Sequence, residues 1–163
     1  MFSYITHDVT ATTRGVVAHG CNCQGVMGSG VALAIRNKWN VAYQRYVEFV
    51  SSTTTNNPSN VLLGLAQIIN VGHPLIDEPN SLFVSNMFTQ DQFGRDGKRY
   101  ADPSAIRRAL TDTISFCQGA NLPLYIPRIG CGLGGLVWEQ DVQPIVEEVV
   151  SLYSVEVFVC DLP

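Results

Sequence analysis

The sequence predicts an α/β protein in which helices cover both faces of a sheet. Strand-like and helix-like segments alternate along the 163-residue chain, and such alternation is typical of this architecture. The length suits a single domain, residues 1–163, that is large enough to bury a core. Hydrophobic residues make up 46% of the chain and charged residues 15%, a balance that excludes an intrinsically disordered protein.

The first half of the chain contains two strands, two helices and a polar loop. Phe2–Ile5 and Val16–His19 are apolar runs of strand length. A helix is expected over Ser29–Lys38 and a second over Val41–Val50, where large residues recur on one side. The Ser, Thr, Asn and Pro residues of Ser51–Asn60 predict a loop.

The second half repeats the alternation of strands and helices. Strand-like runs are found at Leu62–Val71 and Leu82–Phe88. Asp102 is expected to cap a helix with Pro103 at its first position, and Gly119 to end that helix. The remaining elements are a strand at Leu124–Ile126, a helix striped with Val and Ile from Val142 to Val150, and a closing strand at Val155–Val159.

Two glycine-rich loops, Ala18–Ile35 and Pro127–Glu139, each follow a strand-like run and lead into a helix-like one. Glycine lets the backbone approach a ligand closely, and the first N–H groups of a helix favour anions. In such sheets, ligands bind where loops leave the carboxyl ends of the strands. We therefore expect the two loops to form one cradle for a diphosphate or another extended anion. Neither loop matches the dinucleotide-binding fingerprint or the phosphate loop of nucleoside triphosphatases.

The net charge of −4 disfavours binding to duplex nucleic acid, because such proteins normally carry a basic field. The local basic cluster is interpreted as a solvated loop and helix face. Its members are Arg95, Lys98, Arg99, Arg107 and Arg108. An anion is therefore expected to be held mainly by backbone N–H groups.

The termini and the cysteines suggest a cytoplasmic protein without membrane contact. No apolar stretch is long enough to span a bilayer, and the first ten residues lack the features of a signal peptide. Five cysteines are an odd number, so we expect free, buried thiols. Cys21 and Cys23 lie too close in sequence for a typical zinc site, and no metal or other cofactor is expected. The modest size suggests a monomer.

Four segments, in this order, resemble those of the macrodomain superfamily, which binds ADP-ribose. They are Asp8–Thr10, the pair His19–Cys23 with Gly28–Ala32, Asn86–Gln90 and Pro127–Glu139. The resemblance covers nearly the whole chain and implies a three-layer α/β/α fold with a central mixed sheet flanked by helices. It also implies small-molecule ADP-ribose derivatives as partners. The His-x-Cys-Asn-Cys run is most similar to the branch that hydrolyses ADP-ribose 1″-phosphate to ADP-ribose and phosphate.

The resemblance assigns binding roles to three segments. Asp8, with Val9 beside it, matches the aspartate that accepts a hydrogen bond from the adenine amino group; the alternative for Asp8 is a turn or capping role ahead of Thr10. The residues expected to hold the diphosphate are Gly28, Ser29, Gly30 and Val31 in the first loop, and Gly130, Cys131, Gly132, Leu133 and Gly134 in the second.

Catalytic roles are expected for His19, Asn22 and Asp91. Asn22 matches the residue that holds the distal ribose, with an Asx turn as the alternative. His19 has a side chain that exchanges protons near neutral pH, so it is expected to activate water or protonate the leaving oxygen. Its alternative is a core histidine hydrogen-bonded to backbone. Asp91 is a second acid–base candidate, or else a solvated loop carboxylate.

Two other functions remain open. Related branches that remove ADP-ribose from protein or nucleic acid use a Lys directly after the Asn-x-x-Thr segment, and some use an Asp in the second loop. This chain has Gln90 and Gly134 at those places, and neither can form a lysyl adduct or act as a base. A non-catalytic reader of ADP-ribose would need the same cradle without His19. Phe93 is expected to cover the ribose in either case, or else to be an exposed turn aromatic.

Overall fold

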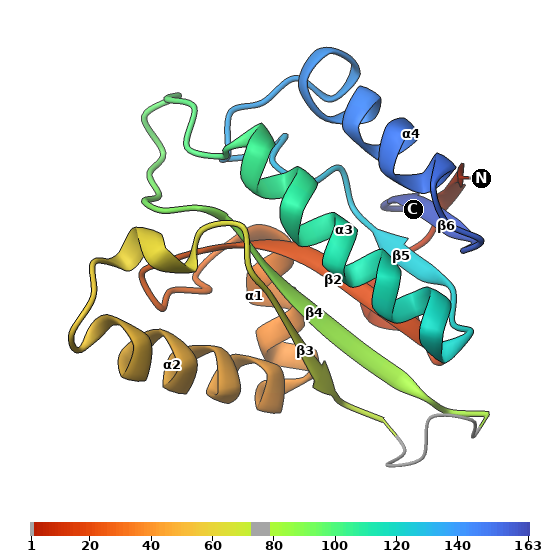
Figure 1. Ribbon diagram of the computed structural model, residues 1–163, viewed down its shortest axis with the longest axis horizontal. Coiled ribbons are helices and arrows are strands. Elements are labelled where there is room, and N and C mark those ends of the chain that lie inside the picture. The colour runs from red at the N-terminus through yellow and green to blue at the C-terminus, as the bar shows by residue number, and fades with distance from the viewer. Residues whose placement is uncertain (1, 73–78) are drawn as a thin grey trace.

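The computed structural model describes residues 2–72 and 79–163, which form a six-stranded mixed sheet (Figure 1). The strands are β1 (Phe2–Thr6), β2 (Gly15–Asn22), β3 (Ala66–Asn70), β4 (Leu82–Gln90), β5 (Leu124–Ile126) and β6 (Val157–Asp161), in the spatial order β1-β6-β5-β2-β4-β3. The pairs from β1 to β4 in this order are parallel, whereas β3 is antiparallel to β4.

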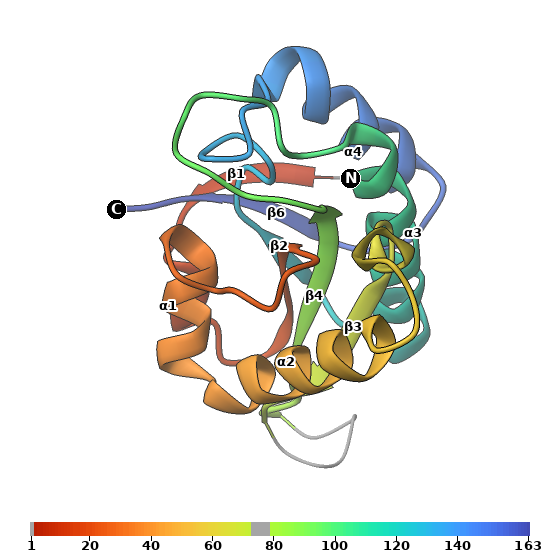
Figure 2. The ribbon, with the colours of Figure 1, turned by 90° about the vertical axis from the view of Figure 1, so that its left-hand side faces the viewer.

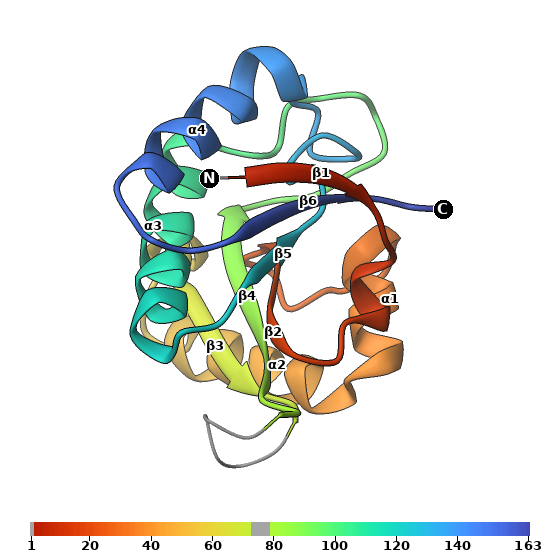
Figure 3. The same cartoon turned by 90° about the vertical axis from the view of Figure 1, so that its right-hand side faces the viewer.

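Helices cover both faces of this sheet, which confirms the predicted three-layer α/β/α fold (Figures 2 and 3). The helices are α1 (Gly30–Lys38) and α2 (Asn40–Thr54) on one face, and α3 (Pro103–Ala120) and α4 (Gln143–Ser151) on the other. Short turns of helix occur at η1 (Val9–Ala11), η2 (Ser59–Leu62) and η3 (Trp138–Val142). None of the helices in the described ranges is both long and apolar enough to cross a membrane.

The two faces of the sheet bury different side chains because strand residues alternate between faces. Val16 and Ala18 of β2 belong to the core under α3 and α4, whereas Val17 packs with Ile35 and Trp39 of the α1 region. Each face of the sheet therefore packs against its own pair of helices.

The start of α3 is as predicted, and its end differs by one residue. The Asp102 carboxylate accepts a hydrogen bond from the Ser104 backbone N–H at 2.9 Å, and Pro103 occupies the first turn. The helix runs past Gly119 to Ala120, because Asn121 adopts the left-handed conformation (φ 54°) that ends it.

The predicted polar loop over Ser51–Asn60 is wrong in its first part, because α2 continues to Thr54. The Thr54 hydroxyl donates to the Val50 carbonyl oxygen at 2.7 Å, so this polar side chain bonds within the helix. The following η2 includes Leu62, and β3 consequently begins at Ala66 rather than at Leu62. At the other end of the chain, β6 lies two residues later than the predicted Val155–Val159.

Three adjacent parallel strands, β5, β2 and β4, end at the same edge of the sheet. The loops that follow them are residues 127–137, 23–29 and 91–102. The first two contain the glycine-rich segments. Figure 2 shows the loop after β4, in green, arching over the loop after β5, in blue.

Candidate functional site

A cavity of about 420 Å³ opens at the carboxyl edge of β5, β2 and β4. Its wall is formed by the three loops, the first turn of α1 and the last residues of β2 and β4. The volume lies in the range of sites that enclose small-molecule ligands, and the position is the one expected for an α/β sheet. This cavity is therefore the candidate site.

Both glycine-rich loops line the cavity. Of the residues predicted to hold a diphosphate, those that line it are Gly28, Ser29, Gly30, Val31, Gly130, Gly132, Leu133 and Gly134. Cys131 does not line it; its thiol donates to the Ile129 carbonyl oxygen at 3.4 Å and packs against the core instead.

The first turn of α1 presents backbone donors to the cavity. The Leu33 N–H bonds to the Ser29 carbonyl oxygen, so the N–H groups of residues 30–32 precede the first bond of the helix. Ser29 provides no side-chain cap for them. Gly30 has a φ of 58°, a conformation that favours glycine, and its backbone opens the helix at the cavity wall. These donors and the helix dipole favour an anion at this place.

The second glycine-rich loop is fastened to the segment before α3. The Gly134 carbonyl oxygen accepts hydrogen bonds from the N–H groups of Tyr100 and Ala101, at 2.9 and 3.0 Å. A Cβ at position 134 would lie 2.7 Å from the Gly130 carbonyl oxygen and 3.0 Å from the Ala101 Cβ. The loop in this conformation has no room for a carboxylate side chain at Gly134.

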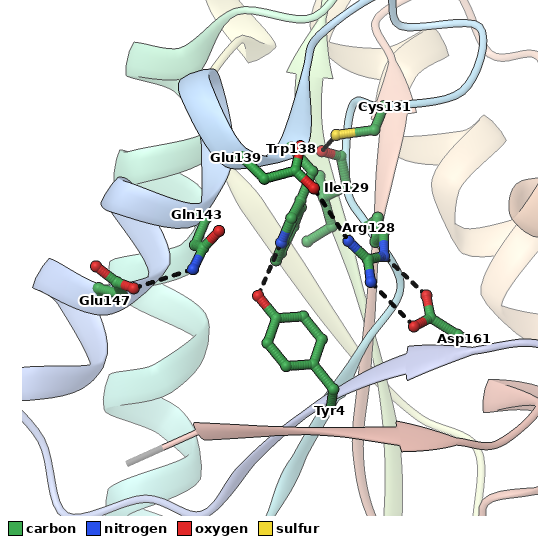
Figure 4. A network of polar contacts seen from close by, with 9 residues as sticks. All are labelled: Tyr4, Arg128, Ile129, Cys131, Trp138, Glu139, Gln143, Glu147 and Asp161. Atoms are coloured by element: carbon green, nitrogen blue, oxygen red, sulfur yellow. Dashed lines mark hydrogen bonds and ion pairs between the residues drawn. The ribbon is translucent and has the colours of Figure 1, made fainter.

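Arg128 lines the cavity, but its guanidinium is committed to other side chains (Figure 4). Its Nε and Nη2 donate to the two carboxylate oxygens of Asp161 at 2.8 and 3.0 Å. The same group lies over the rings of Tyr4 and Trp138, at 5.2 and 5.6 Å from their centroids. The hydrogen bond with Asp161 raises the pKa of Arg128 and lowers that of Asp161. The network fixes the start of the second loop to β6, and no sequence motif pointed to it.

His19 contributes to the cavity wall, but its side chain lies in the core, with 1% of the residue exposed. Its Nε2 donates to the Asn86 Oδ1 at 2.7 Å, across the β2–β4 pair. The Asn86 amide nitrogen donates to the Ala42 carbonyl and to the Gln67 Oε1, an arrangement that leaves its oxygen as the acceptor. Burial lowers the pKa of His19 to about 4, against the opposing effect of the Asn86 hydrogen bond.

The imidazole is therefore neutral at pH 7 and turned away from solvent. The alternative of a core histidine is what the structure shows, with the Asn86 side chain rather than backbone as its partner. The predicted proton transfer by His19 is not supported by this position.

Asn22 lines the cavity and forms an Asx turn. Its Oδ1 accepts from the Gln24 N–H at 2.9 Å and lies 2.8 Å from the Tyr46 hydroxyl, while its Nδ2 donates to the Val26 carbonyl oxygen at 2.8 Å. Asn22 is buried, with 9% of the residue exposed, and its hydrogen bonds stabilise the first glycine-rich loop. Its contact with the distal ribose stays a prediction.

Asp91 does not line the cavity, and its carboxylate is hydrogen-bonded rather than solvated; its acid–base role stays a prediction. Its Oδ1 accepts hydrogen bonds from the Ser59 hydroxyl at 2.6 Å and from the Gln24 amide at 3.1 Å. Its backbone oxygen accepts from the Cys23 N–H at 3.0 Å. Asp91 thus ties the first glycine-rich loop to η2.

Asp8 and Val9 also lie outside the cavity wall. The Asp8 Oδ1 accepts from the N–H and hydroxyl of Thr10, at 2.9 and 2.7 Å, and caps η1. These hydrogen bonds lower the pKa of Asp8, so it is a carboxylate at neutral pH. Val9 is buried in the same hydrophobic cluster as Ile35 of α1. The capping alternative for Asp8 is confirmed, and its contact with adenine stays a prediction.

The end of β4 and the loop after it supply wall residues outside the predicted diphosphate-binding set, and the expected cover of the ribose by Phe93 stays a prediction. Gln90, Phe93 and Arg95 line the cavity, and Phe93 is 49% exposed. The neighbouring Lys98 and Arg99 form ion pairs with carboxylates on the surface, as expected for a solvated cluster. Arg95 differs from them because of its place at the cavity.

The five cysteines are free, as predicted, and four of them are buried; Cys131 is half-buried, so the prediction of burial is wrong for this one. Within residues 2–72 and 79–163, no group of three or more His, Cys, Asp or Glu side chains is arranged to hold a metal ion.

Comparisons with known proteins place the chain in a family. No protein-family model matches it. The ADP-ribose 1″-phosphate phosphatase of Meyerozyma guilliermondii is 31% identical over 159 residues, covering 85% of this chain and 88% of the relative. The structure of a macrodomain protein from Streptomyces coelicolor superposes with a TM-score of 0.78 at 26% identity, over the full length of both chains.

A third similar structure is that of Thermosipho africanus DarTG in complex with ADP-ribose, with a TM-score of 0.75 at 18% identity. The match covers 99% of this chain and 41% of that one, and it shows likeness of fold alone. The relative of 31% identity and the shared architecture together show that this chain belongs to the macrodomain superfamily.

Proposed function

We propose that this protein binds ADP-ribose and hydrolyses ADP-ribose 1″-phosphate to ADP-ribose and phosphate. The observation that carries the proposal is the cavity where the first turn of α1 and the second glycine-rich loop present backbone to the same space. The similarity to a phosphatase of that name supports the choice of substrate.

The diphosphate of the ligand would lie between the two glycine-rich loops. The N–H groups of residues 30–32 precede the first helical bond, and those of residues 132–134 are not used in any backbone hydrogen bond of the described chain. A hydrogen bond to a charged group contributes about 1.5–3 kcal/mol. Several such bonds would offset the net charge of −4 that the protein carries.

The reaction transfers a phosphoryl group to water. The water oxygen forms a bond to phosphorus, the bond from phosphorus to the anomeric oxygen breaks, and a proton from the water ends on that oxygen. Charge develops on the phosphoryl oxygens, and preorganised N–H donors stabilise it. Since His19 is neutral and buried, the proposal assigns the main catalytic effect to this electrostatic stabilisation.

Two features disfavour removal of ADP-ribose from protein or nucleic acid. Gln90 stands where related enzymes have a lysine, and its amide nitrogen donates to the Gln92 carbonyl oxygen at 2.9 Å. A side chain at position 134 would clash with the Gly130 backbone, so a carboxylate cannot replace Gly134 without a shift of the loop.

One observation favours a non-catalytic reader of ADP-ribose as the second candidate. Among the residues described, no carboxylate lines the cavity, and the only histidine in its wall is buried. A reader would bind the ligand through the same backbone donors and would leave a terminal phosphate intact.

Phosphate release from ADP-ribose 1″-phosphate, measured alongside ADP-ribose binding by calorimetry, separates the candidates. The proposal expects saturable phosphate release and competitive inhibition by ADP-ribose. Binding without phosphate release would establish the reader. Cleavage of ADP-ribosylated protein or DNA without phosphate release would establish the hydrolase instead.

A further inference from the structure

We propose that Arg95 recognises the terminal phosphate of the ligand and so distinguishes ADP-ribose 1″-phosphate from ADP-ribose. This inference rests on the proposed function, because it concerns the substrate of the same cavity. Arg95 lies in the loop between β4 and α3, and it lines the cavity together with Phe93 and Gly94.

Arg95 is the uncommitted cation of this cavity wall. It forms no hydrogen bond or ion pair with any residue in the described ranges, whereas Arg128 has two guanidinium nitrogens bonded to Asp161. Lys98 and Arg99, in the same loop, do not line the cavity and are paired with Asp96 and Asp141. A free guanidinium at a cavity is suited to a phosphate monoester, which it binds through two parallel N–H donors.

Arg95 and the backbone donors of the cradle belong to different segments of the same cavity wall. The loop after β4 also contacts the loop after β5, since the N–H groups of Tyr100 and Ala101 donate to the Gly134 carbonyl oxygen. The diphosphate donors belong to α1 and to the loop after β5, and Arg95 to the loop after β4. ADP-ribose 1″-phosphate has two anionic groups with a ribose between them, and the cavity wall contains both a backbone cradle and an unpaired guanidinium.

The charge balance of the protein gives this arginine a discriminating role. The protein has a net charge of −4, and an additional phosphomonoester adds further negative charge to the ligand. Without an unpaired cation in the cavity wall, ADP-ribose 1″-phosphate, which carries more negative charge, would bind more weakly than ADP-ribose. With Arg95 in the wall, the protein binds ADP-ribose 1″-phosphate more tightly than ADP-ribose.

The test measures the affinities of wild type, Arg95→Gln and Lys98→Gln for both ligands. Lys98→Gln is the matched control, since it removes one positive charge from the same loop without altering the cavity wall. Binding is followed by displacement of a fluorescent ADP-ribose analogue, and free phosphate is measured in the same samples. We expect Arg95→Gln to weaken the binding of ADP-ribose 1″-phosphate by about tenfold or more and the binding of ADP-ribose by less than about threefold. Lys98→Gln is expected to match the wild type.

The role of Arg95 would be overturned if Arg95→Gln weakened the binding of both ligands equally or of neither. It would also be overturned if Lys98→Gln showed the same selective loss of affinity for ADP-ribose 1″-phosphate. If the wild type binds ADP-ribose 1″-phosphate and shows the selective loss in Arg95→Gln but releases no phosphate, the phosphatase proposal fails and the recognition by Arg95 stands. Binding of neither ligand by the wild type would overturn both.

Discussion

His19 joins the two central strands of the sheet through a buried hydrogen bond to Asn86. Its position on β2 gives part of this result in advance: Val17, His19 and Cys21 alternate along the strand, and Val17 faces the core under α1. Asn86 lies far away in sequence and meets His19 only through strand pairing. The His-x-Cys-Asn-Cys run therefore indicated correctly which strand end lies at the cavity. The proton transfer predicted for His19 depends on its burial and its partner, which the local sequence does not specify.

The buried imidazole is expected to make the stability of the protein fall in mild acid. The unfolded chain takes up a proton near pH 6.5, while the folded protein resists protonation of His19 until about pH 4. The stabilisation is thus complete above pH 6.5 and is lost as the pH falls towards 4, by roughly 3 kcal/mol in total. Urea unfolding between pH 7.5 and 4.5 checks this.

The comparison variant is His19→Gln, whose side-chain amide supplies an N–H donor in place of the imidazole N–H but does not titrate. It is expected to be less stable than the wild type at pH 7.5 and to lose less stability on acidification. A wild-type histidine signal from His19 that titrates near 6.5 by NMR would contradict the burial-based account.

Asp91 is expected to act on the shape of the first glycine-rich loop rather than on the reaction. Asp91→Asn keeps an oxygen that can accept from Ser59 and Gln24, whereas Asp91→Ala removes it. We expect Asp91→Asn to retain more than about half of the activity and Asp91→Ala to lose about 1–2 kcal/mol of stability, seen in chemical unfolding. A hundredfold fall in kcat for Asp91→Asn, with wild-type stability, would restore an acid–base role.

At the scale of elements, the second glycine-rich loop owes its shape to contacts with segments distant in sequence. Gly134 bonds to Tyr100 and Ala101, and Arg128 bonds to Asp161. Elements with strong local signals, such as α3 with its Asp102 cap, were predicted within a residue of their ends. The end of α2 was missed because its last turns are polar and stabilised by threonine hydroxyls. Capping and periodicity are local, whereas loop anchors are tertiary.

Gly134→Ala is expected to weaken ADP-ribose binding by about tenfold or more, because the new Cβ would lie 2.7 Å from the Gly130 carbonyl oxygen and displace the loop. Calorimetric titration with ADP-ribose measures the loss. Gly119→Ala is the control: its Cβ on α3 would meet nothing within 4 Å, so affinity should be unchanged and stability should rise by about 0.5–1 kcal/mol. Unchanged affinity in Gly134→Ala would remove the loop from the binding site.

At the scale of the whole molecule, three neighbouring parallel strands bring their loops to one edge, and this placement makes a site from segments at both ends of the chain. The alternation of strands and helices was sufficient to predict three layers and the meeting of the two glycine-rich loops. It could not indicate Arg95 as a wall residue, since an exposed polar loop has no periodicity that shows which residues face a ligand. The cradle of backbone donors was predictable from the sequence, and the resemblance pointed to Phe93, but nothing in the sequence pointed to Arg95.

The central claim is that the N–H groups at the start of α1 and in the second glycine-rich loop bind the diphosphate of ADP-ribose. Titration of ¹⁵N-labelled protein with ADP-ribose tests it most directly. We expect saturable shifts centred on the amides of residues 30–32 and 132–134. Shifts centred instead on the hollow between Phe2 and Tyr153, or no saturable shifts at all, would contradict it.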